Sequence, residues 1–502
     1  MDLLGNLAHG FAVALSFDNL LFALIGAFIG TAIGVLPGIG PVATISLLLP
    51  ITFGQPATTA IIMLAGIYYG AQYGGSTTAI LLNLPGEVSS VVTAIDGYKM
   101  ARNGRAGAAL TIAALGSFFA GTVGTILVAA SGPLLTKVAL SFGPADYFSL
   151  MLLGLIISAV LAQGSVVKSI AMVALGVALG LVGTDVQTGQ QRFTFGIPEL
   201  SDGIGFTSIA MGMFGISEII LNLERPEARS VLGAKIGSMW LTRTETRRAI
   251  PAVLRGTVLG SVLGILPGGG AALAAFGSYM MERKMSGHGK EFGNGAIEGV
   301  AGPESANNAA AQTSFIPLLT LGIPSNAVMA LMVGALIIQG IQPGPRMVEA
   351  QPDLFWGLIC SMWIGNLMLL VINLPLIGMW VKLLKVPYRY LYPSILIFCA
   401  VGVYSLNNSV FDIYQTLFFG ILGYTFSKLN LSAAPLLIGF VLGPMMEEHL
   451  RRAMLLSRGD AFVFVDFSTR PISASLLVVC AIVLGTMLLP SLRRKKDEAL
   501  AE

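Results

Sequence analysis

The sequence predicts an all-α, multi-pass membrane protein made of two inverted-topology repeats, each carrying a re-entrant, broken-helix hairpin. Three observations predict it: an apolar composition, two copies of one glycine-rich stretch, and an uneven distribution of basic residues. Of 502 residues, 55% are hydrophobic and 11% are charged, whereas an ordinary soluble domain has about 25% charged residues. Apolar segments recur from residue 20 to residue 489, enough for about 10–12 membrane spans of roughly 20 residues each.

A glycine at every fourth position marks the two copies, which lie 230 positions apart. This spacing puts the glycines on one helix face, where another backbone can approach closely. Each copy then reaches a proline and further glycines, which end a helix and permit turns. A membrane tolerates the unpaired backbone groups of such a break only inside protein or beside water, so each break is a candidate site. The first copy is Gly26, Gly30, Gly34 and Gly38, ending in LPGIGP (36–41); the second is Gly256, Gly260, Gly264 and Gly268, ending in LPGGG (266–270).

In the first half, residues 1–17 are weakly apolar and are expected at the membrane interface, and 20–36 form the first deep helix. The apolar run after the break ends near Phe53, and its roughly 13 residues reach only ~20 Å, short of the ~30 Å hydrocarbon core. A re-entrant hairpin is therefore expected. Residues 57–82 form a long helix that ends at a second break, Asn83-Leu84-Pro85-Gly86. Further helices are expected at 107–130, 147–163, 167–183 and 204–221.

Basic residues are concentrated between 222 and 255 and predict a cytoplasmic linker, because positively charged loops stay in the cytoplasm. We therefore divide the chain into a first membrane repeat (1–222), a cytoplasmic linker (223–250) and a second membrane repeat (251–502). The basic tail at 493–496 places the C-terminus in the cytoplasm. The second repeat is expected to contain a broken hairpin at 256–282, a long polar-faced helix at 294–319, a break at 322–326, and apolar segments near 354–381, 391–406, 411–427, 433–446 and 472–490.

Equivalent loops of the two halves differ in charge. The basic loop with Lys99, Arg102 and Arg105 corresponds to uncharged positions 239 residues later, and the basic residues of 283–290 correspond to uncharged positions 230 residues earlier. Equivalent loops are therefore expected on opposite sides of the membrane, so that the hairpins enter from opposite faces, as in many secondary transporters.

Polar side chains recur at every fourth position of the long helix in each half. Interhelical hydrogen bonds could satisfy such groups without any ligand. The coincidence of polar stripe, break and glycine-lined hairpin in both halves favours a functional interpretation instead. The second-half stripe is Glu304, Asn308 and Gln312 with Asn307 beside it, and its counterpart at an offset of 236 is Tyr68, Gln72 and Ser76.

Glu304 is the one carboxylate within these stripes, and an ionisable residue inside a membrane is a candidate for an ion pathway. It could coordinate a cation or carry a proton. Alternatively, it caps a helix that starts after Pro303 or pairs with a nearby arginine. Glu87 and Asp96 follow the first break and are expected to approach the basic loop, and residues 447–452 are expected to form an interfacial charge cluster.

The sequence carries no catalytic constellation. His9, His288 and His449 are scattered, and no Ser-His-Asp order, Walker lysine or HExxH motif occurs. The three cysteines lie in apolar segments without metal-ligand spacing. We expect no enzymatic activity, no cofactor, no nucleic-acid partner, and an uncleaved N-terminus because no basic region precedes the first apolar segment.

Three stretches resemble the large membrane subunit of the tripartite tricarboxylate transporters over nearly the whole chain. They are the pair GVLPGIGP and GILPGGG, the run YGGSTTAILLNLPGEVSSVVTAIDGYKMARNG, and the run PESANNAAAQTSFIPLLTLGIPSN. One departure is Gly269-Gly270-Ala271, which lacks the proline present at Pro41 and leaves the second half-helix without an N1 proline.

The resemblance implies a three-part uptake system in the lipid bilayer of the bacterial inner membrane. Its other parts are a small membrane subunit of about four spans and a periplasmic solute-binding protein that delivers the substrate. It also implies coupling to a cation gradient, with Na⁺ or H⁺ as the coupling ion. The implied substrates are carboxylates such as citrate, other tri- and dicarboxylates and aromatic acids.

Half-helix N-termini suit substrate carboxylates, while exposed carbonyls and hydroxyls suit Na⁺. Access would alternate as the hairpins and polar helices move against the remaining segments. The expected substrate residues are Pro37, Gly38, Gly40, Gly268, Gly269, Gly270, Asn307 and Asn308. The expected ion ligands are Ser76, Thr77, Asn83, Thr313, Ser314 and Asn326, with Glu304 as a possible proton or cation site.

Two other functions fit parts of the pattern. A passive anion channel would show a polar stripe but would conduct without a gradient. A non-transporting membrane subunit of a larger complex is the second, and haem-ligating histidine pairs inside spans would favour it; the sequence has none.

Overall fold

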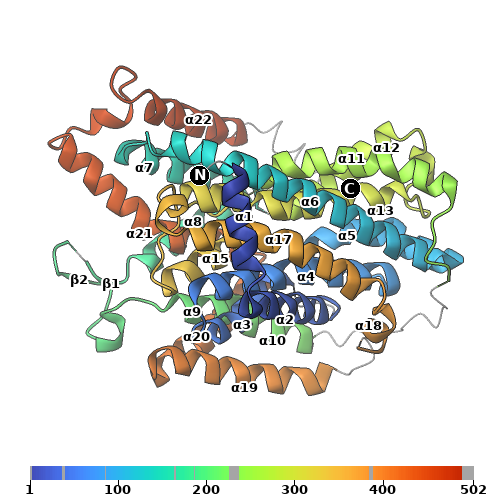
Figure 1. The fold of residues 1–502 in the computed structure, drawn as a ribbon. Helices are drawn as coiled ribbons and strands as arrows, with labels where there is room; N and C mark the ends of the chain where they lie inside the picture. Colours follow the sequence, from blue (N-terminus) through green and yellow to red (C-terminus); the bar gives the residue numbers. More distant parts are fainter. Residues whose placement is uncertain are drawn as a thin grey trace.

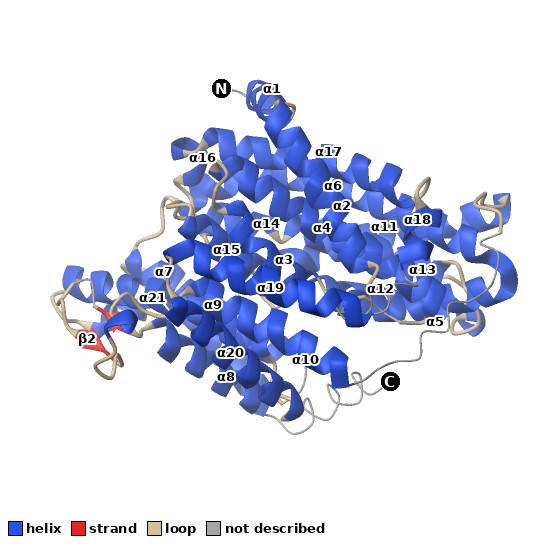
Figure 2. Cartoon of the chain, turned by 90° about the horizontal axis from the view of Figure 1, so that it is seen from below, coloured by secondary structure: helices blue, strands red, loops and turns tan. Residues whose placement is uncertain are grey.

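The computed structural model describes residues 3–36, 40–84, 86–162, 165–185, 187–224, 237–268, 270–383 and 388–488. These residues are mostly helical, as Figures 1 and 2 show, which confirms the predicted all-α class. The strands within these ranges form one short antiparallel hairpin, β1 (Gly183–Thr184) with β2 (Gln191–Arg192), at the edge of the molecule.

Most helices of the first half follow the predicted ranges, but the structure is helical at Val91–Met100 and Ala101–Arg105, where the sequence predicted a basic loop. The long central helix of this half spans the predicted residues 57–82. The helices are α1 (Leu3–Ala14), α2 (Phe17–Gly34), α3 (Pro41–Leu48), α4 (Ala57–Leu82), α5 (Val91–Met100), α6 (Ala106–Ala139), α7 (Pro144–Leu161), α8 (Val166–Gly180), α9 (Phe206–Ala210) and α10 (Ser217–Glu224).

In the second half, the first helix begins at Arg243, so the last residues of the expected linker are already helical. A capping box between Thr242 and Glu245 sets this start. The helices are α11 (Arg243–Ile265), α12 (Gly270–Met285), α13 (Glu298–Thr313), α14 (Phe315–Leu321), α15 (Ala327–Ile338), α16 (Met347–Ala350), α17 (Pro352–Asn373), α18 (Ile377–Leu383), α19 (Tyr388–Asn407), α20 (Val410–Lys428), α21 (Ala433–Leu456) and α22 (Pro471–Leu488).

The protein is a multi-pass membrane protein by the length and apolarity of its helices. Within the described ranges, six helical segments are long and apolar enough to cross a bilayer: Phe17–Gly34, Val88–Ala139, Pro144–Leu161, Phe206–Glu224, Arg243–Ile265 and Pro352–Asn373. Shorter apolar helices, such as Val166–Gly180 and Ala327–Ile338, accompany them. The total of about 10–12 spans, the re-entrant entry of the hairpins and the inverted relation of the halves stay predictions.

The glycine stripes form close backbone contacts, as the four-residue spacing predicts. A Cβ added at Gly30 of α2 would lie 2.7 Å from Cα of Ile67 in α4, and Gly70 of α4 faces α2 in the same way, 2.5 Å from the carbonyl oxygen of Ala27. The two helices therefore meet backbone to backbone. In the second half, α11 meets α13 likewise: a Cβ at Gly260 would lie 2.7 Å from Cα of Ala306.

The glycine contacts also show which residues of the first half correspond to which residues of the second. Gly256, Gly260 and Gly264 face Gly302, Ala306 and Ala310, which lie 239 positions after the partners of the first stripe, Met63, Ile67 and Ala71. The helix ends agree: Asn83 ends α4 in the left-handed region (φ 59°), and Gly322 ends α14 in the same way (φ 74°). The offset of 236 expected for the polar stripes is therefore wrong by almost one helical turn, and Tyr68 corresponds to Asn307.

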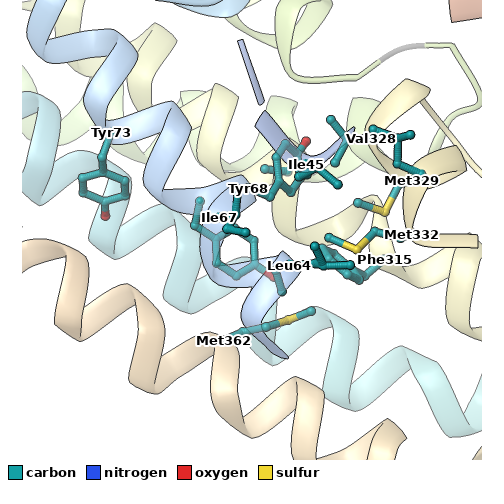
Figure 3. Packing of buried hydrophobic residues seen from close by; sticks show 14 of the residues in the cluster. Ile45, Leu64, Ile67, Tyr68, Tyr73, Phe315, Val328, Met329, Met332 and Met362 are labelled. Carbon is teal, nitrogen blue, oxygen red and sulfur yellow. The ribbon is translucent and has the colours of Figure 1, made fainter. Parts of the chain in front are cut away.

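Buried apolar side chains join the two halves between these helix pairs. Figure 3 shows Ile45 of α3 and Leu64 of α4 in one cluster with Phe315, Met329 and Met332 from α14 and α15. Phe315 and Met329 are fully buried. This core holds α3 and α4 of the first half against the second break.

Candidate functional site

The first hairpin break lies against the first helix break. Gly40 is the N-cap of α3, with Pro41 as its first helical residue. A Cβ added at Gly40 would lie 4.0 Å from Cβ of Glu87 and would meet nothing closer than the Gly86 carbonyl oxygen at 3.9 Å. Glu87 is itself the N-cap of the short turn Val88–Ser90 that leads into α5. The start of α3 therefore lies beside the start of the turn that leads into α5, and a helix start carries a positive dipole end.

The second half repeats this arrangement. Gly270 begins α12 at φ +55°, and a Cβ there would lie 3.7 Å from Cβ of Asn326. Asn326 is the N-cap of α15, and its Oδ1 accepts a hydrogen bond from the Met329 backbone N–H at 3.0 Å. The Gly268 N–H donates to the Ser325 carbonyl at 2.6 Å, which ties the hairpin turn to the helix break.

Each polar helix reaches the break of the other half. Asn307 of α13 donates from Nδ2 to Oε1 of Glu87 at 3.3 Å. Tyr68 of α4, which corresponds to Asn307, has its hydroxyl beside the side chains of Ser314, Gln72 and Asn326. We call the assembly of Gly40, Glu87, Gly270 and Asn326 with Tyr68 and Asn307 the break junction.

Several amide atoms around the break junction have no hydrogen-bond partner. They belong to Gln72 (both amide atoms), Asn307 (Oδ1) and Asn326 (Nδ2), and Gln72 and Asn307 are fully buried. A buried polar atom without a partner is destabilising and calls for a specific explanation. A bound polar ligand would supply the missing partners, and helix N-termini favour an anionic one.

A second polar cluster surrounds Glu304, which is 1% exposed. Ser76 of α4 donates to both carboxylate oxygens at 2.8 Å, and Thr93 of α5 donates to Oε1. Ser117 of α6 lies 3.5 Å from Oε2 and accepts from Asn308 Nδ2 at 2.7 Å. The two structural roles considered for Glu304, helix capping and pairing with an arginine, are therefore wrong. Glu304 lies inside α13 rather than at its start, and among the described residues it forms no ion pair.

The expected substrate residues fall into separate environments. Pro37, Gly38 and Gly269 lie outside the described residues. Gly40, Gly270 and Asn307 lie in the break junction, whereas Gly268 (φ +76°) packs against Ser158 of α7, and Asn308 belongs to the Glu304 cluster.

The expected ion ligands do not form one site. Ser76 and Thr77 line the space beside Glu304, and Ser314 and Asn326 lie near Tyr68. Asn83 is exposed at the end of α4. The hydroxyl of Thr313 faces Gly264 of α11, where the helices contact one another.

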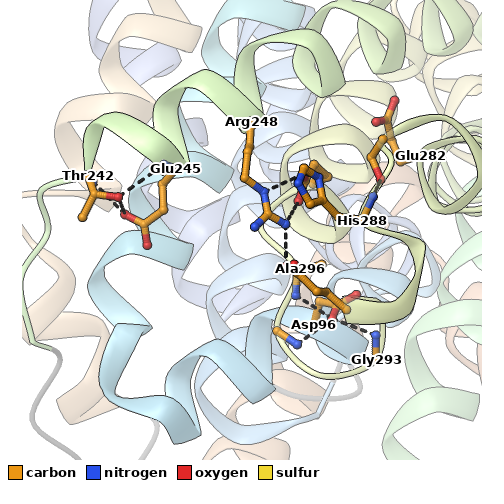
Figure 4. A network of polar contacts seen from close by, with 12 residues as sticks. Asp96, Thr242, Glu245, Arg248, Glu282, His288, Gly293 and Ala296 are labelled. Atoms are coloured by element: carbon orange, nitrogen blue, oxygen red, sulfur yellow. Dashed lines mark hydrogen bonds and ion pairs between the residues drawn. The ribbon is translucent and has the colours of Figure 1, made fainter.

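The prediction that Glu87 and Asp96 approach the basic loop is wrong. Glu87 bonds to Ser89 and Asn307. Asp96 is fully buried and accepts three backbone N–H groups at 2.8–2.9 Å from the loop at 293–296. Figure 4 shows this clamp next to Arg248, which pairs with Glu298 at 2.8 Å. Asp96 therefore holds the start of α13.

Sequence reasoning missed Thr93, Ser117 and Asn373 around Glu304, and the role of Glu87. The correct offset of 239 would have drawn attention to Glu87, because at that offset Glu87 occupies the position equivalent to Asn326. No local signal marks the other three, because they are ordinary polar residues in apolar helices.

Residues 447–452 form the predicted charge cluster, and its place at the membrane interface stays a prediction. Arg451 binds Asp185 at 2.8 Å and Glu447 at 2.6 Å, and Arg192 binds Glu447 at 2.8 Å. The backbone N–H of Gln187, followed by the Thr188 hydroxyl and Arg451, holds the pKa of Asp185 well below its usual value. The cluster fixes the β hairpin to the end of α21.

Comparison with known proteins gives one family. The model of the tripartite tricarboxylate transporter TctA family matches residues 20–438. A protein of Agrobacterium vitis named "Uncharacterized 52.8 kDa protein in TAR-I ttuC' 3'region" is 59% identical over 502 residues, which cover all of this chain and 99% of that protein. Another from that organism, "Uncharacterized protein in TAR-II ttuC' 3'region", is 62% identical over 243 residues, 48% of this chain and 99% of that one. No solved structure matches this chain.

Proposed function

This chain belongs to the tripartite tricarboxylate transporter TctA family, and from that premise we propose that it takes up carboxylates by secondary transport. It is a multi-pass membrane component of a tripartite system, from a family of transporters rather than enzymes. In our proposal it is the large permease subunit in the bacterial inner membrane. A small subunit of about four spans and a periplasmic solute-binding protein are its partners, and its C-terminus is cytoplasmic.

The break junction is the substrate site in this proposal. Carboxylate oxygens would accept hydrogen bonds from backbone N–H groups at the starts of α3, α5, α12 and α15, with their positive dipole ends. The unpaired amide nitrogens of Gln72 and Asn326 would donate further hydrogen bonds to the carboxylate, and the unpaired Asn307 Oδ1 would accept one from a substrate hydroxyl. A di- or tricarboxylate would use both breaks, because Asn307 contacts Glu87 at the first break and the Tyr68 hydroxyl lies beside Asn326 at the second.

Alternating access follows from the way the breaks are held. Each hairpin is bound to a long helix by glycine contacts, while its break touches a helix start. Movement of α3 and α12 with their hairpins would open the junction to one side at a time and carry the substrate together with a cation that moves down its gradient.

The observation that carries the proposal is the set of unpaired amide atoms beside helix N-termini. The test is uptake of radiolabelled tri-, di- and aromatic carboxylates into proteoliposomes that contain this chain, its small subunit and its binding protein. Gln72→Ala should raise the apparent KM about ten-fold, as expected for one lost hydrogen bond to a charged group. The matched control is Asn19→Ala, since Asn19 is buried with both ends of its amide bonded.

Two results would contradict the proposal. Uptake at the full rate without the partner subunits would exclude the tripartite mechanism. Uptake that persists unchanged after the ion gradients are collapsed would indicate a passive channel.

A further inference from the structure

A cavity of about 20 Å³ lies beside the Glu304 carboxylate, between α4, α6, α13 and the end of α17. Glu304, Ser76, Ser117 and Asn373 are among its lining residues. A volume of this size suits one water molecule or one dehydrated small cation. We call it the Glu304 cavity.

The lining of the Glu304 cavity has an unused oxygen as well as a carboxylate. Asn373 is 4% exposed; its Nδ2 donates to the Leu369 carbonyl at 2.9 Å, and its Oδ1 has no partner. The hydroxyls of Ser76 and Ser117 line the same cavity and lie next to the Glu304 carboxylate. The lining therefore combines a carboxylate, hydroxyl oxygens and an amide oxygen that has no hydrogen-bond partner.

The charge of the Glu304 cavity is also unbalanced. Within the part of the chain that the structure describes, Glu304 pairs with no lysine, arginine or histidine, and hydroxyl donors alone do not neutralise a buried carboxylate. One carboxylate among neutral oxygens balances a single positive charge. Hard cations prefer such oxygen ligands, and transporters bind Na⁺ in this kind of surrounding.

We propose that the Glu304 cavity is a Na⁺ site, with Glu304, Asn373 Oδ1 and the hydroxyls of Ser76 and Ser117 as ligands. This inference names the coupling ion and its site, and in that respect it rests on the proposed function.

The site is connected to the break junction through two helices. Thr93 binds Glu304 from α5, the helix that Glu87 leads into. Glu304 lies one turn before Asn307, which binds Glu87. A cation between Glu304 and Asn373 would therefore fix α5 and α13 relative to α17 and set the position of the first break. Substrate binding at the junction is expected to strengthen when Na⁺ is bound.

The test measures ion binding without transport. The purified full chain in detergent is titrated with ²²Na⁺ by equilibrium dialysis, and its thermal unfolding is followed in NaCl and in KCl at equal ionic strength. Saturable ²²Na⁺ binding and a Na⁺-specific rise in Tm are expected. Glu304→Gln should abolish binding, and Asn373→Leu should weaken it by about ten-fold or more, as for a lost metal contact.

Ser117→Ala and Ser361→Ala form the matched pair. Both remove a buried serine hydroxyl, but among the described residues Ser361 bonds only to the Leu358 carbonyl on α17, and it does not line the Glu304 cavity. Ser117→Ala should weaken ²²Na⁺ binding, and Ser361→Ala should leave it unchanged.

Equal responses to Na⁺ and K⁺, or unchanged binding in Asn373→Leu, would overturn the assignment. Proton uptake by the wild-type chain without ²²Na⁺ binding would overturn it too and assign a proton to Glu304. If ²²Na⁺ binds as expected but the reconstituted system moves no carboxylate, the Na⁺ site stands and the proposed function fails.

Discussion

The two helix breaks have the same backbone plan but different end groups. The first leaves α4 through Asn83 and enters the next helix at Glu87, whereas the second leaves α14 through Gly322 and enters α15 at Asn326. Each break faces the glycine that starts the adjacent half-helix, Gly40 or Gly270. The N–H groups and dipoles are thus alike at the two ends, while a carboxylate stands at only one of them.

The two breaks therefore share the backbone groups that would bind an anion and differ in the charge of one side chain. Backbone N–H groups attract an anion at either break. Glu87 opposes an anion at the first break by like-charge repulsion, and the amide of Asn326 does not. We therefore expect a bound carboxylate to favour the second break, with the first break sensitive to the charge on Glu87.

The comparison of the two halves is tested most strongly by their orientation in the membrane. If the halves are inverted repeats, Gly54→Cys and Lys284→Cys, at positions 230 apart, should be labelled from opposite sides of the membrane by an impermeant maleimide. Both native positions are exposed, and the three native cysteines are buried. Complete labelling of both from one side would exclude the inverted arrangement.

The second-largest effect is expected from substitutions at the glycine contacts between helices. Gly30→Ala and Gly260→Ala each force a Cβ into the facing helix backbone, so each should lower stability by about 1–3 kcal/mol or more. Yield and Tm of the purified chain should fall in both halves alike. A loss confined to one half would show that the two helix pairs are not equivalent.

The glycines that start the half-helices should affect uptake rather than folding. Gly40→Ala fits the space and the backbone (φ −75°) of the unliganded protein, so the protein should fold normally. The added Cβ would crowd a carboxylate that approaches the half-helix start, so the apparent affinity should fall roughly five- to 150-fold, the effect of losing about 1–3 kcal/mol of anion binding. Gly270→Ala adds backbone strain at φ +55° and should lose some Tm as well. Unchanged uptake in a well-expressed Gly40→Ala chain would remove this half-helix start from the site.

The smallest effect is expected from exchanging the end groups. Glu87→Gln should strengthen, and Asn326→Asp should weaken, the apparent affinity for an anionic substrate, each by about ten-fold at most. The double variant moves the carboxylate to the other break and should return the affinity toward the wild-type value. Changes of the same sign in both single variants would contradict a purely electrostatic difference.

Much of the fold could be predicted from the sequence because its signals are local. Proline and glycine end helices within a few residues, which located the breaks at 36–41 and at 83–86. The four-residue glycine spacing predicted backbone contact on one face, and α2 with α4 confirm it. Apolar length and composition predicted a multi-pass helical membrane protein.

The sequence did not determine which groups meet. Asn307 reaches Glu87 across 220 positions, and Ser76 reaches Glu304 across 228. An asparagine or serine in an apolar helix carries no mark of its distant partner, because any nearby polar group could satisfy it. The 236 offset failed for this reason: it matched residue types, whereas helix packing gives 239.

The sequence by itself therefore determined most of the helices, their breaks and the glycine faces, since each depends on the conformational limits of a few neighbouring residues. Tertiary structure alone decided that Tyr68 and Asn307 cross to the opposite breaks and that Asn373 joins Glu304 around one cavity. Those arrangements depend on how whole helices pack, and packing is set by the sum of many weak contacts rather than by any one motif.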